Sequence, residues 1–213
     1  LPLRDRQPFL QVDPSDREKI QSIFLGKNRD DLILVHAGIG WTSNTLPADL
    51  WRSYVQALRN AGFQVVLIGR QTVHNNGITR GVHFNLGEVE FDLRNQLSLS
   101  ELIALIEFVP ILLTNDSGPL HIAGAFDNWI GLIASAKSPD FVFPYRHGSQ
   151  SFRTQSLENY QPYDNEFDFD PLEYSGVNTS HLDHETVRKL APTQEQIVAW
   201  AKRIRQDSQT ASV

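Results

Sequence analysis

A short polar turn between two apolar segments carries residue types that could hold a phosphate group. Asn, Asp, Ser and Gly at positions 115–118 follow an apolar run at 111–113 and precede Pro119. A continuous apolar run is typical of a buried parallel strand, and proline is favoured as a first helical residue. A strand that continues as a helix after such a turn leaves backbone N–H groups at the helix start, and these attract phosphate. The pattern predicts an anion site here.

Within this turn we expect the amides of Ser117 and Gly118 to be the donors, with Asp116 and His121 beside the ligand. Gly118 has no side chain, so the backbone could approach a ligand closely. A second interpretation remains open, in which Asp116 and Ser117 only cap a structural helix.

A second candidate turn contains Gly38 and Gly40 and follows an expected strand at 31–37. Because the carboxyl ends of parallel strands share one edge of a sheet, this turn would face the same phosphates. Three residues with hydroxyl or amide side chains follow it: Thr42, Ser43 and Asn44.

Arg70, directly after an expected strand at 63–68, is a candidate cation at the same edge, and ordinary surface exposure is its alternative. His36 and His121 each sit within an apolar run, as polar groups around the ligand or as hydrogen-bonded structural histidines. His147 is less interpretable.

Several of these segments occur together in one protein family. Residues 115–123, NDSGPLHIA, resemble the Asp-Ser/Thr-Gly-x-x-His motif of the lipopolysaccharide heptosyltransferase family, glycosyltransferase family 9. Three further pieces follow that family's order: a His-x-Gly turn within 32–40, a strand at 65–69 and a helix start at 97–102. The resemblance covers roughly residues 30–150.

The resemblance implies a Rossmann-like parallel sheet with helices on both faces, the carboxyl-terminal, nucleotide-sugar-binding half of a GT-B enzyme. It implies inverting transfer of a sugar, heptose being one candidate, from a nucleoside-diphosphate sugar to a saccharide or lipid-linked acceptor. No metal or other cofactor is implied. The catalytic base would come from an amino-terminal domain or partner subunit. We therefore expect this chain alone to bind donor nucleotide weakly and not to transfer sugar.

The sequence departs from the family's pattern in two places. Family members resemble Gly-x-Ser-x-x-x-Lys-x-Trp-Pro after the first strand, whereas Asn44 stands at the position of the lysine. A neutral amide can bond to phosphate but cannot neutralise its charge. Family members also carry an acid soon after the second strand, which residues 70–74 lack; Glu88 or Glu90 could hold the ribose instead.

These departures keep a second function open: a non-catalytic regulatory or assembly module that retains the glycosyltransferase fold. A nucleotide-sugar epimerase of similar architecture is a third, weaker hypothesis.

Apolar periodicity predicts the elements that position these residues. Strands are expected at 31–37, 63–68, 82–86, 111–113 and 129–134, and helices at 15–25, 47–61, 97–108, 119–125 and 193–205. Residues 87–94 are expected to be an acidic loop. Alternation of strands and helices indicates an α/β protein with a parallel sheet. We expect one domain at 1–205 and a disordered tail at 206–213.

Residues 155–185 form an acidic and aromatic segment that we expect to be irregular. It contains eight Asp or Glu residues and no Lys or Arg. A solvated loop, a docking surface and a divalent-metal site are its three interpretations. The metal site is the least favoured, because the glycine and terminal glutamate of a calcium loop are missing at the required offsets.

Composition and charge exclude or disfavour several classes of function. A net charge of -6 over 213 residues disfavours nucleic acid as a partner. The absence of cysteine excludes disulfides and thiolate chemistry. No apolar run reaches the ~18 residues of a membrane span, so a cytoplasmic protein is expected. The chain starts at Leu1 and lacks methionine, so we expect a fragment or a processed product.

Overall fold

A computed structural model of the protein describes residues 8–40, 45–71, 73–75, 78–133, 142–146, 148–157 and 184–210. Its centre is a six-stranded sheet with the order β6-β3-β1-β7-β8-β9, in which all neighbours are parallel. The strands are β1 (Leu32–His36), β3 (Gln64–Leu67), β6 (Phe91–Asp92), β7 (Ile111–Asn115), β8 (Trp129–Ile133) and β9 (Thr154–Ser156). The expected α/β parallel sheet is confirmed.

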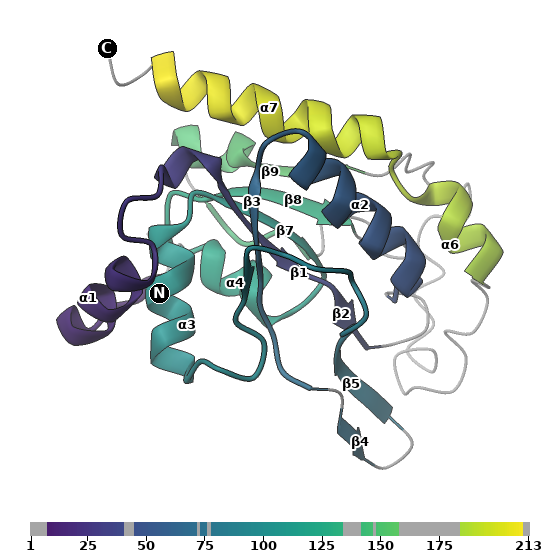
Figure 1. The fold of residues 1–213 in the computed structure, drawn as a ribbon, viewed down its shortest axis with the longest axis horizontal. Coiled ribbons are helices and arrows are strands. Elements are labelled where there is room, and N and C mark those ends of the chain that lie inside the picture. Colours follow the sequence, from purple (N-terminus) through teal and green to yellow (C-terminus); the bar gives the residue numbers. More distant parts are fainter. Residues whose placement is uncertain are drawn as a thin grey trace, which may run out of the picture.

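Helices cover both faces of this sheet (Figure 1). α2 (Ala48–Asn60) and α7 (Gln194–Thr210) pack on one face, against Ile33 and Val35 of β1. α1 (Pro14–Ile23), α3 (Leu99–Phe108) and α4 (Gly118–Ala123) pack on the other face, against Leu32 and Leu34. Successive strand residues point to opposite faces, so β1 contributes to both cores and is buried throughout.

Two expectations about short strands are wrong. The segment expected as a parallel strand, 82–86, is strand only at Val82, the last residue of β5 (Ile78–Val82). β5 instead forms a small antiparallel sheet with β4 (Val73–Asn75) and β2 (Gly38–Ile39). β3 pairs in parallel with β1 on one side and, on the other side, with β6, which lies within the expected acidic loop. A strand of two residues is too short to show a period.

Several helix boundaries also differ from expectation. α1 is capped by Asp13, whose side chain accepts from the Ser15 N–H at 2.8 Å, and not by Ser15. α7 continues to Thr210, so residues 206–210, expected in the disordered tail, are helical. α3, within the helix expected at 97–108, begins at Leu99 and is capped by Ser98, which forms a reciprocal capping box with Glu101.

The acidic segment at 155–185 is regular at both ends. β9 overlaps the first two residues of this segment, and α6 (His184–Leu190) begins at its second-last residue. Residues 158–183, which carry most of its acids, lie outside the described residues. Two short 3-10 helices, η1 (Arg29–Asp31) and η3 (Gly148–Arg153), complete the described elements. None of the helices in the described ranges is long and apolar enough to cross a membrane.

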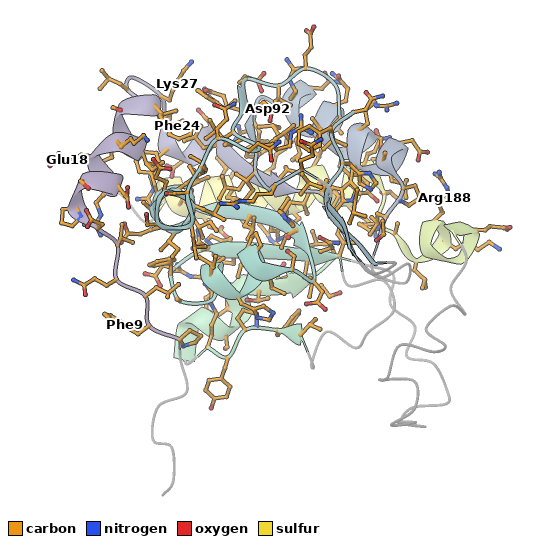
Figure 2. The ribbon with its side chains drawn as sticks, turned by 90° about the horizontal axis from the view of Figure 1, so that it is seen from below. Phe9, Glu18, Phe24, Lys27, Asp92 and Arg188 are labelled. Carbon is orange, nitrogen blue, oxygen red and sulfur yellow. The ribbon has the colours of Figure 1, made fainter. Side chains whose placement is uncertain are left out.

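Aromatic packing attaches α1 to the edge of the sheet. Phe24, directly after α1, lies 4.8 Å from the ring of Phe91 in β6 and 5.6 Å from that of Phe108 in α3. Figure 2 shows Phe24 beside Lys27 at this end of the molecule, with Arg188 of α6 on the opposite side. The amino-terminal helix is therefore part of the same core as β6 and α3.

Candidate functional site

The β1–β2 and β7–α4 turns lie against each other at the carboxyl edge of the sheet. Asn115, the last residue of β7, donates through Nδ2 to the Gly38 carbonyl at 3.1 Å and accepts through Oδ1 from the Gly38 N–H at 3.2 Å. A Cβ at Gly38 would lie 2.4 Å from that Oδ1 atom, so this approach requires glycine. The structure thus brings together the two turns that were expected to face one ligand.

A buried histidine lies beneath this junction. The Nδ1 atom of His36 is 3.1 Å from the Ser117 hydroxyl and 3.4 Å from the Thr114 hydroxyl. Burial lowers the pKa of the His36 imidazole to about 4, so the ring is neutral at pH 7. His36 therefore supplies hydrogen bonding at the turn and no positive charge, which agrees with the interpretation of a hydrogen-bonded structural histidine.

The serine of the motif does not cap the helix that follows it. Ser117 has the extended backbone of an N-cap, but its side chain makes no capping bond to α4. Its hydroxyl instead lies 3.1 Å from the Asn115 carbonyl and 3.0 Å from the Thr114 hydroxyl. A Cβ at Gly118 would meet no atom of the described residues within 4 Å. Within the described part of the chain, the start of α4 is therefore open beside Gly118, and the Ser117 hydroxyl bonds inside the turn.

Asp116 and His121 lie on the same turn and helix. Asp116 Oδ1 is 3.9 Å from His121 Nε2, a contact that is an ion pair only when the histidine is protonated. The His121 side chain is 57% exposed, against 17% for Asp116. The imidazole of His121 is therefore accessible to a ligand at this edge.

The second turn is only partly described. The Gly40 N–H donates to the Thr45 hydroxyl at 3.0 Å, so this amide already has an acceptor within the chain. Thr42, Ser43 and Asn44 lie outside the described residues.

A pocket of about 280 Å³ opens beyond the end of β3. Its walls are largely apolar and are formed by Gly69, Arg70, Leu93, Leu97, Ser98, Leu99 and Leu102. Gly69 has a φ of +124°, and Val82 and His36 pack against it where a Cβ would stand. Gly69 therefore belongs both to the wall of this pocket and to the surroundings of the buried histidine.

Comparison with known proteins decides the family. The family model described as glycosyltransferase family 9 (heptosyltransferase) matches residues 1–166 of this chain. The chain belongs to glycosyltransferase family 9.

Curated members of family 9 resemble the chain over part of its length. Lipopolysaccharide heptosyltransferase 2 of Salmonella typhimurium is 29% identical over 153 residues, which cover 68% of this chain and 43% of that protein. The protein of the same name from Escherichia coli is 30% identical over 114 residues, which cover 50% of this chain and 33% of that protein. The chain thus matches less than half of the length of either relative.

Solved structures agree with the family in fold. A family 9 glycosyl transferase from Veillonella parvula superposes with a TM-score of 0.66 at 16% identity, covering 93% of this chain and 54% of that one. The E. coli ADP-heptose lps heptosyltransferase II gives a TM-score of 0.65 at 18% identity, covering 98% and 56%. Identities this low establish the shared fold alone.

The acids considered for ribose in this family 9 chain lie away from the pocket or are exposed. Glu90 accepts from Arg59 Nε at 3.0 Å and from the Val65 N–H at 3.2 Å, near the beginning of β3. The pocket is at the other end of β3, so Glu90 does not reach it. Glu88 is exposed. Within the described residues, no group of three or more acidic or histidine side chains could hold a metal ion.

Three residues at the site were not chosen from the sequence. Asn115 was read as part of a turn, but its side chain joins the two turns. Thr114 lies between the expected strand at 111–113 and the expected turn, and its hydroxyl bonds within the His36 network. Asn95 lies in a stretch without periodicity and bonds to the Gly69 and Gln71 backbone. Of the three, only Asn115 carried a sequence signal, because an asparagine directly follows the apolar strand. That signal did not show that Gly38 is its hydrogen-bond partner.

Proposed function

We propose that this chain is the donor-binding domain of a family 9 glycosyltransferase. The enzyme would transfer a sugar, heptose being one candidate, from a nucleoside-diphosphate sugar to a saccharide or lipid-linked acceptor. The observation that carries the proposal is the reciprocal Asn115–Gly38 pairing, which holds two turns of the family's motif side by side at the carboxyl edge of a parallel sheet. Ligands of open α/β sheets bind at this edge.

The open side of Gly118 is the proposed position of the diphosphate. The Ser117 side chain does not cap α4, and a Cβ at Gly118 would meet no atom of the described residues within 4 Å. Backbone amides in such a turn can donate to phosphate oxygens. α4 has only six residues, so local N–H donors matter more here than a helix dipole.

The leucine-lined pocket is the proposed position of the base. Apolar side chains suit the flat faces of a nucleobase, and the volume of about 280 Å³ is close to the ~300 Å³ lower end of ligand pockets. Arg70 lines this pocket and is exposed, so its guanidinium could stabilise the negative charge of the donor. This would partly replace the lysine that is absent at Asn44.

The proposal includes a second domain that completes the enzyme, because the chain matches less than half of the length of each curated relative. The acceptor and the catalytic base would belong to an amino-terminal domain or partner subunit. The chain alone would then bind donor nucleotide and not transfer sugar.

Calorimetric titration with ADP, GDP and UDP tests donor binding. Gly118→Val should weaken binding of the nucleotide at least about tenfold, because its side chain would occupy the proposed phosphate position, where an added Cβ meets none of the described residues within 4 Å. Gln194→Val, at the first residue of the surface helix α7, is the matched control and should leave binding unchanged. Equal binding by wild type and Gly118→Val would exclude this phosphate position.

A non-catalytic assembly module is the second candidate, favoured by Asn44 at the lysine position and by the neutral state of His36. The same titration separates the two functions. A donor-binding domain binds one of the three nucleotides, whereas a pure assembly module binds none.

A further inference from the structure

Asn95 is the only non-glycine residue with a positive φ among the described residues. Its φ is 63°, in the left-handed region that asparagine tolerates better than most residues do. Asn95 lies in the connection between β6 and α3. It stands between Leu93 and Leu97, which both line the pocket beyond β3.

Two hydrogen bonds join Asn95 to the residues on either side of Arg70, which also lines that pocket. The Asn95 N–H donates to the Gly69 carbonyl at 2.9 Å, and its Oδ1 accepts from the Gln71 N–H at 2.6 Å. The residues before and after Arg70 are thus bonded to one asparagine. These bonds hold the backbone on both sides of Arg70 and so restrict the direction in which its side chain points.

The turn that carries Asn95 is itself anchored. The preceding residue, Arg94, is buried, donates to the His83 carbonyl at 2.6 Å and to the Asp92 carboxylate at 2.7 Å, and lies over the Phe84 ring. Asn95 therefore connects Arg70 to a rigid part of the fold.

Arg70 differs from Arg94 in its surroundings. It is exposed, it lines the pocket, and no carboxylate within the described ranges forms a salt bridge with it. An exposed cation that lines an apolar pocket and has no carboxylate partner among the described residues is suited to an anionic ligand.

We propose that Asn95 is a positioning residue, which holds Arg70 at the mouth of the pocket so that its guanidinium meets the diphosphate of the bound nucleotide. This inference rests on the proposed donor-binding function. Asparagine tolerates the left-handed backbone conformation, and its side-chain oxygen accepts the Gln71 N–H without adding a charge. Aspartate would also accept from Gln71, but its charge would oppose the diphosphate and attract Arg70.

A double-mutant cycle with Asn95→Gly and Arg70→Gln tests the inference. Glycine accepts the positive φ and keeps the bond to Gly69, so Asn95→Gly removes only the side-chain acceptor. The probe is whichever of ADP, GDP and UDP the wild-type chain binds most tightly, together with its nucleoside. Arg70→Gln should weaken nucleotide binding about fivefold, as an exposed charge pair would.

Asn95→Gly should weaken nucleotide binding about threefold when Arg70 is present and should have no further effect in Arg70→Gln, because coupled residues are not additive. Nucleoside binding should be unchanged in every variant. Asn28→Gly is the matched control: its side chain accepts from the Asp30 N–H at 3.3 Å before β1, at the opposite end of the sheet, and its loss should leave both affinities unchanged.

The outcomes separate this inference from the function on which it rests. Wild-type protein that binds none of the three nucleotides would overturn both. Wild-type binding that Asn95→Gly does not weaken, or weakens equally in the Arg70→Gln background, would overturn the role of Asn95 alone. Should Asn95→Gly fold poorly by thermal unfolding, Asn95→Asp provides the second variant: it keeps the acceptor and should still weaken nucleotide binding more than nucleoside binding.

Discussion

The side-chain amide of Asn115 and the peptide group of Gly38 form two reciprocal hydrogen bonds across 77 residues of sequence. Asn115 is 2% exposed, so its polar atoms bond within the protein, to Gly38 among others, in place of water. The pair fixes the distance between the ends of β1 and β7. Any change that separates the two strand ends should therefore affect stability and ligand binding together.

Gly38→Ala should be destabilising. The added Cβ would lie 2.4 Å from Asn115 Oδ1 and 3.0 Å from His36 Cε1, so the turn must move. We expect a loss of about 1–3 kcal/mol in the free energy of unfolding, measured by urea denaturation. Gly118→Ala is the control, because its Cβ meets no atom of the described residues within 4 Å and should change stability by less than about 1 kcal/mol. Equal stabilities of the two variants would contradict the close approach at Gly38.

His36 should make stability depend on pH. Burial lowers its pKa to about 4 in the folded protein from the ordinary 6.5, so the unfolded chain binds more protons between these values. The contribution of neutral His36 to the free energy of unfolding is complete above pH 6.5 and is lost as the pH falls toward 4. Over that window the loss should approach about 3 kcal/mol.

His36→Asn removes this titration and provides the comparison. The difference in unfolding free energy between wild type and variant should shrink from pH 7 to pH 5 in urea denaturation. Glu101, whose pKa the Lys19 hydrogen bond lowers to about 2, loses its contribution only as the pH falls below 4.5, so the two effects occupy different windows. A pH-independent difference would show that His36 is not buried in its neutral form.

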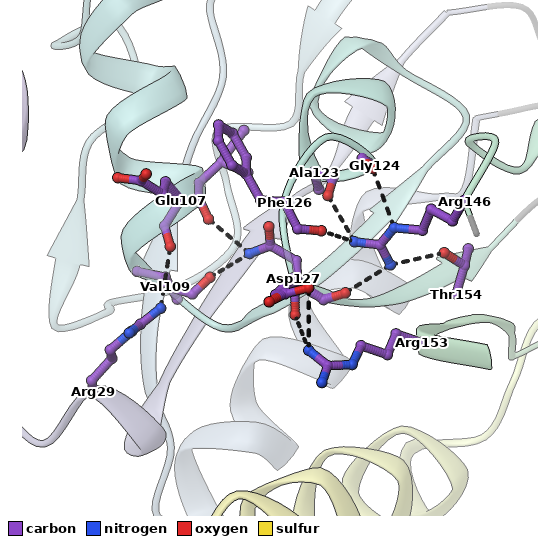
Figure 3. Close-up of polar contacts among 12 residues, drawn as sticks. Arg29, Glu107, Val109, Ala123, Gly124, Phe126, Asp127, Arg146, Arg153 and Thr154 are labelled. Atoms are coloured by element: carbon purple, nitrogen blue, oxygen red, sulfur yellow. Dashed lines mark hydrogen bonds and ion pairs between the residues drawn. The ribbon is translucent and has the colours of Figure 1, made fainter. Parts of the chain in front are cut away.

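Arg146 should be among the residues on which stability depends most. The side chain is buried and burial lowers its pKa to about 10. Figure 3 shows its guanidinium surrounded by acceptors from the end of α4, the following loop and β9. These acceptors are the carbonyls of Ala123, Gly124, Phe126 and Asn128 and the hydroxyl of Thr154.

Arg146→Ala leaves these buried acceptors without a donor, which should reduce the free energy of unfolding by about 3–5 kcal/mol. Arg188→Ala is the control, since the Arg188–Asp49 pair is exposed on both sides and should contribute at most about 1 kcal/mol. Thermal unfolding of both variants measures the contrast. Similar melting temperatures for the two would show that the Arg146 network is not needed for the fold.

The central strands and main helices could be predicted because their signals are local. Continuous apolar runs mark β1, β3, β7 and β8, and these strands are buried along most of their length. The reciprocal Ser98–Glu101 capping box lies within the expected helix start at 97–102 and is likewise local in sequence. Both signals depend on neighbours within a few residues.

Short edge strands and some boundaries could not be predicted. β6 and β9 have two and three residues, and their pairing to β3 and β8 makes them strands. At the start of α1, Asp13 and Ser15 are both residue types that cap helices, and in the structure Asp13 is the cap.

The amino-acid sequence by itself determined the class of fold and the location of the motif turn, because apolar runs and turn residues act over short stretches of chain. Only the tertiary structure decided which turns meet. The pairing of Asn115 with Gly38, the burial of His36 and the bonds of Asn95 on either side of Arg70 all join segments far apart in the chain. Hydrogen-bond partners of this kind depend on the packing of the sheet, and no local pattern of residues specifies them.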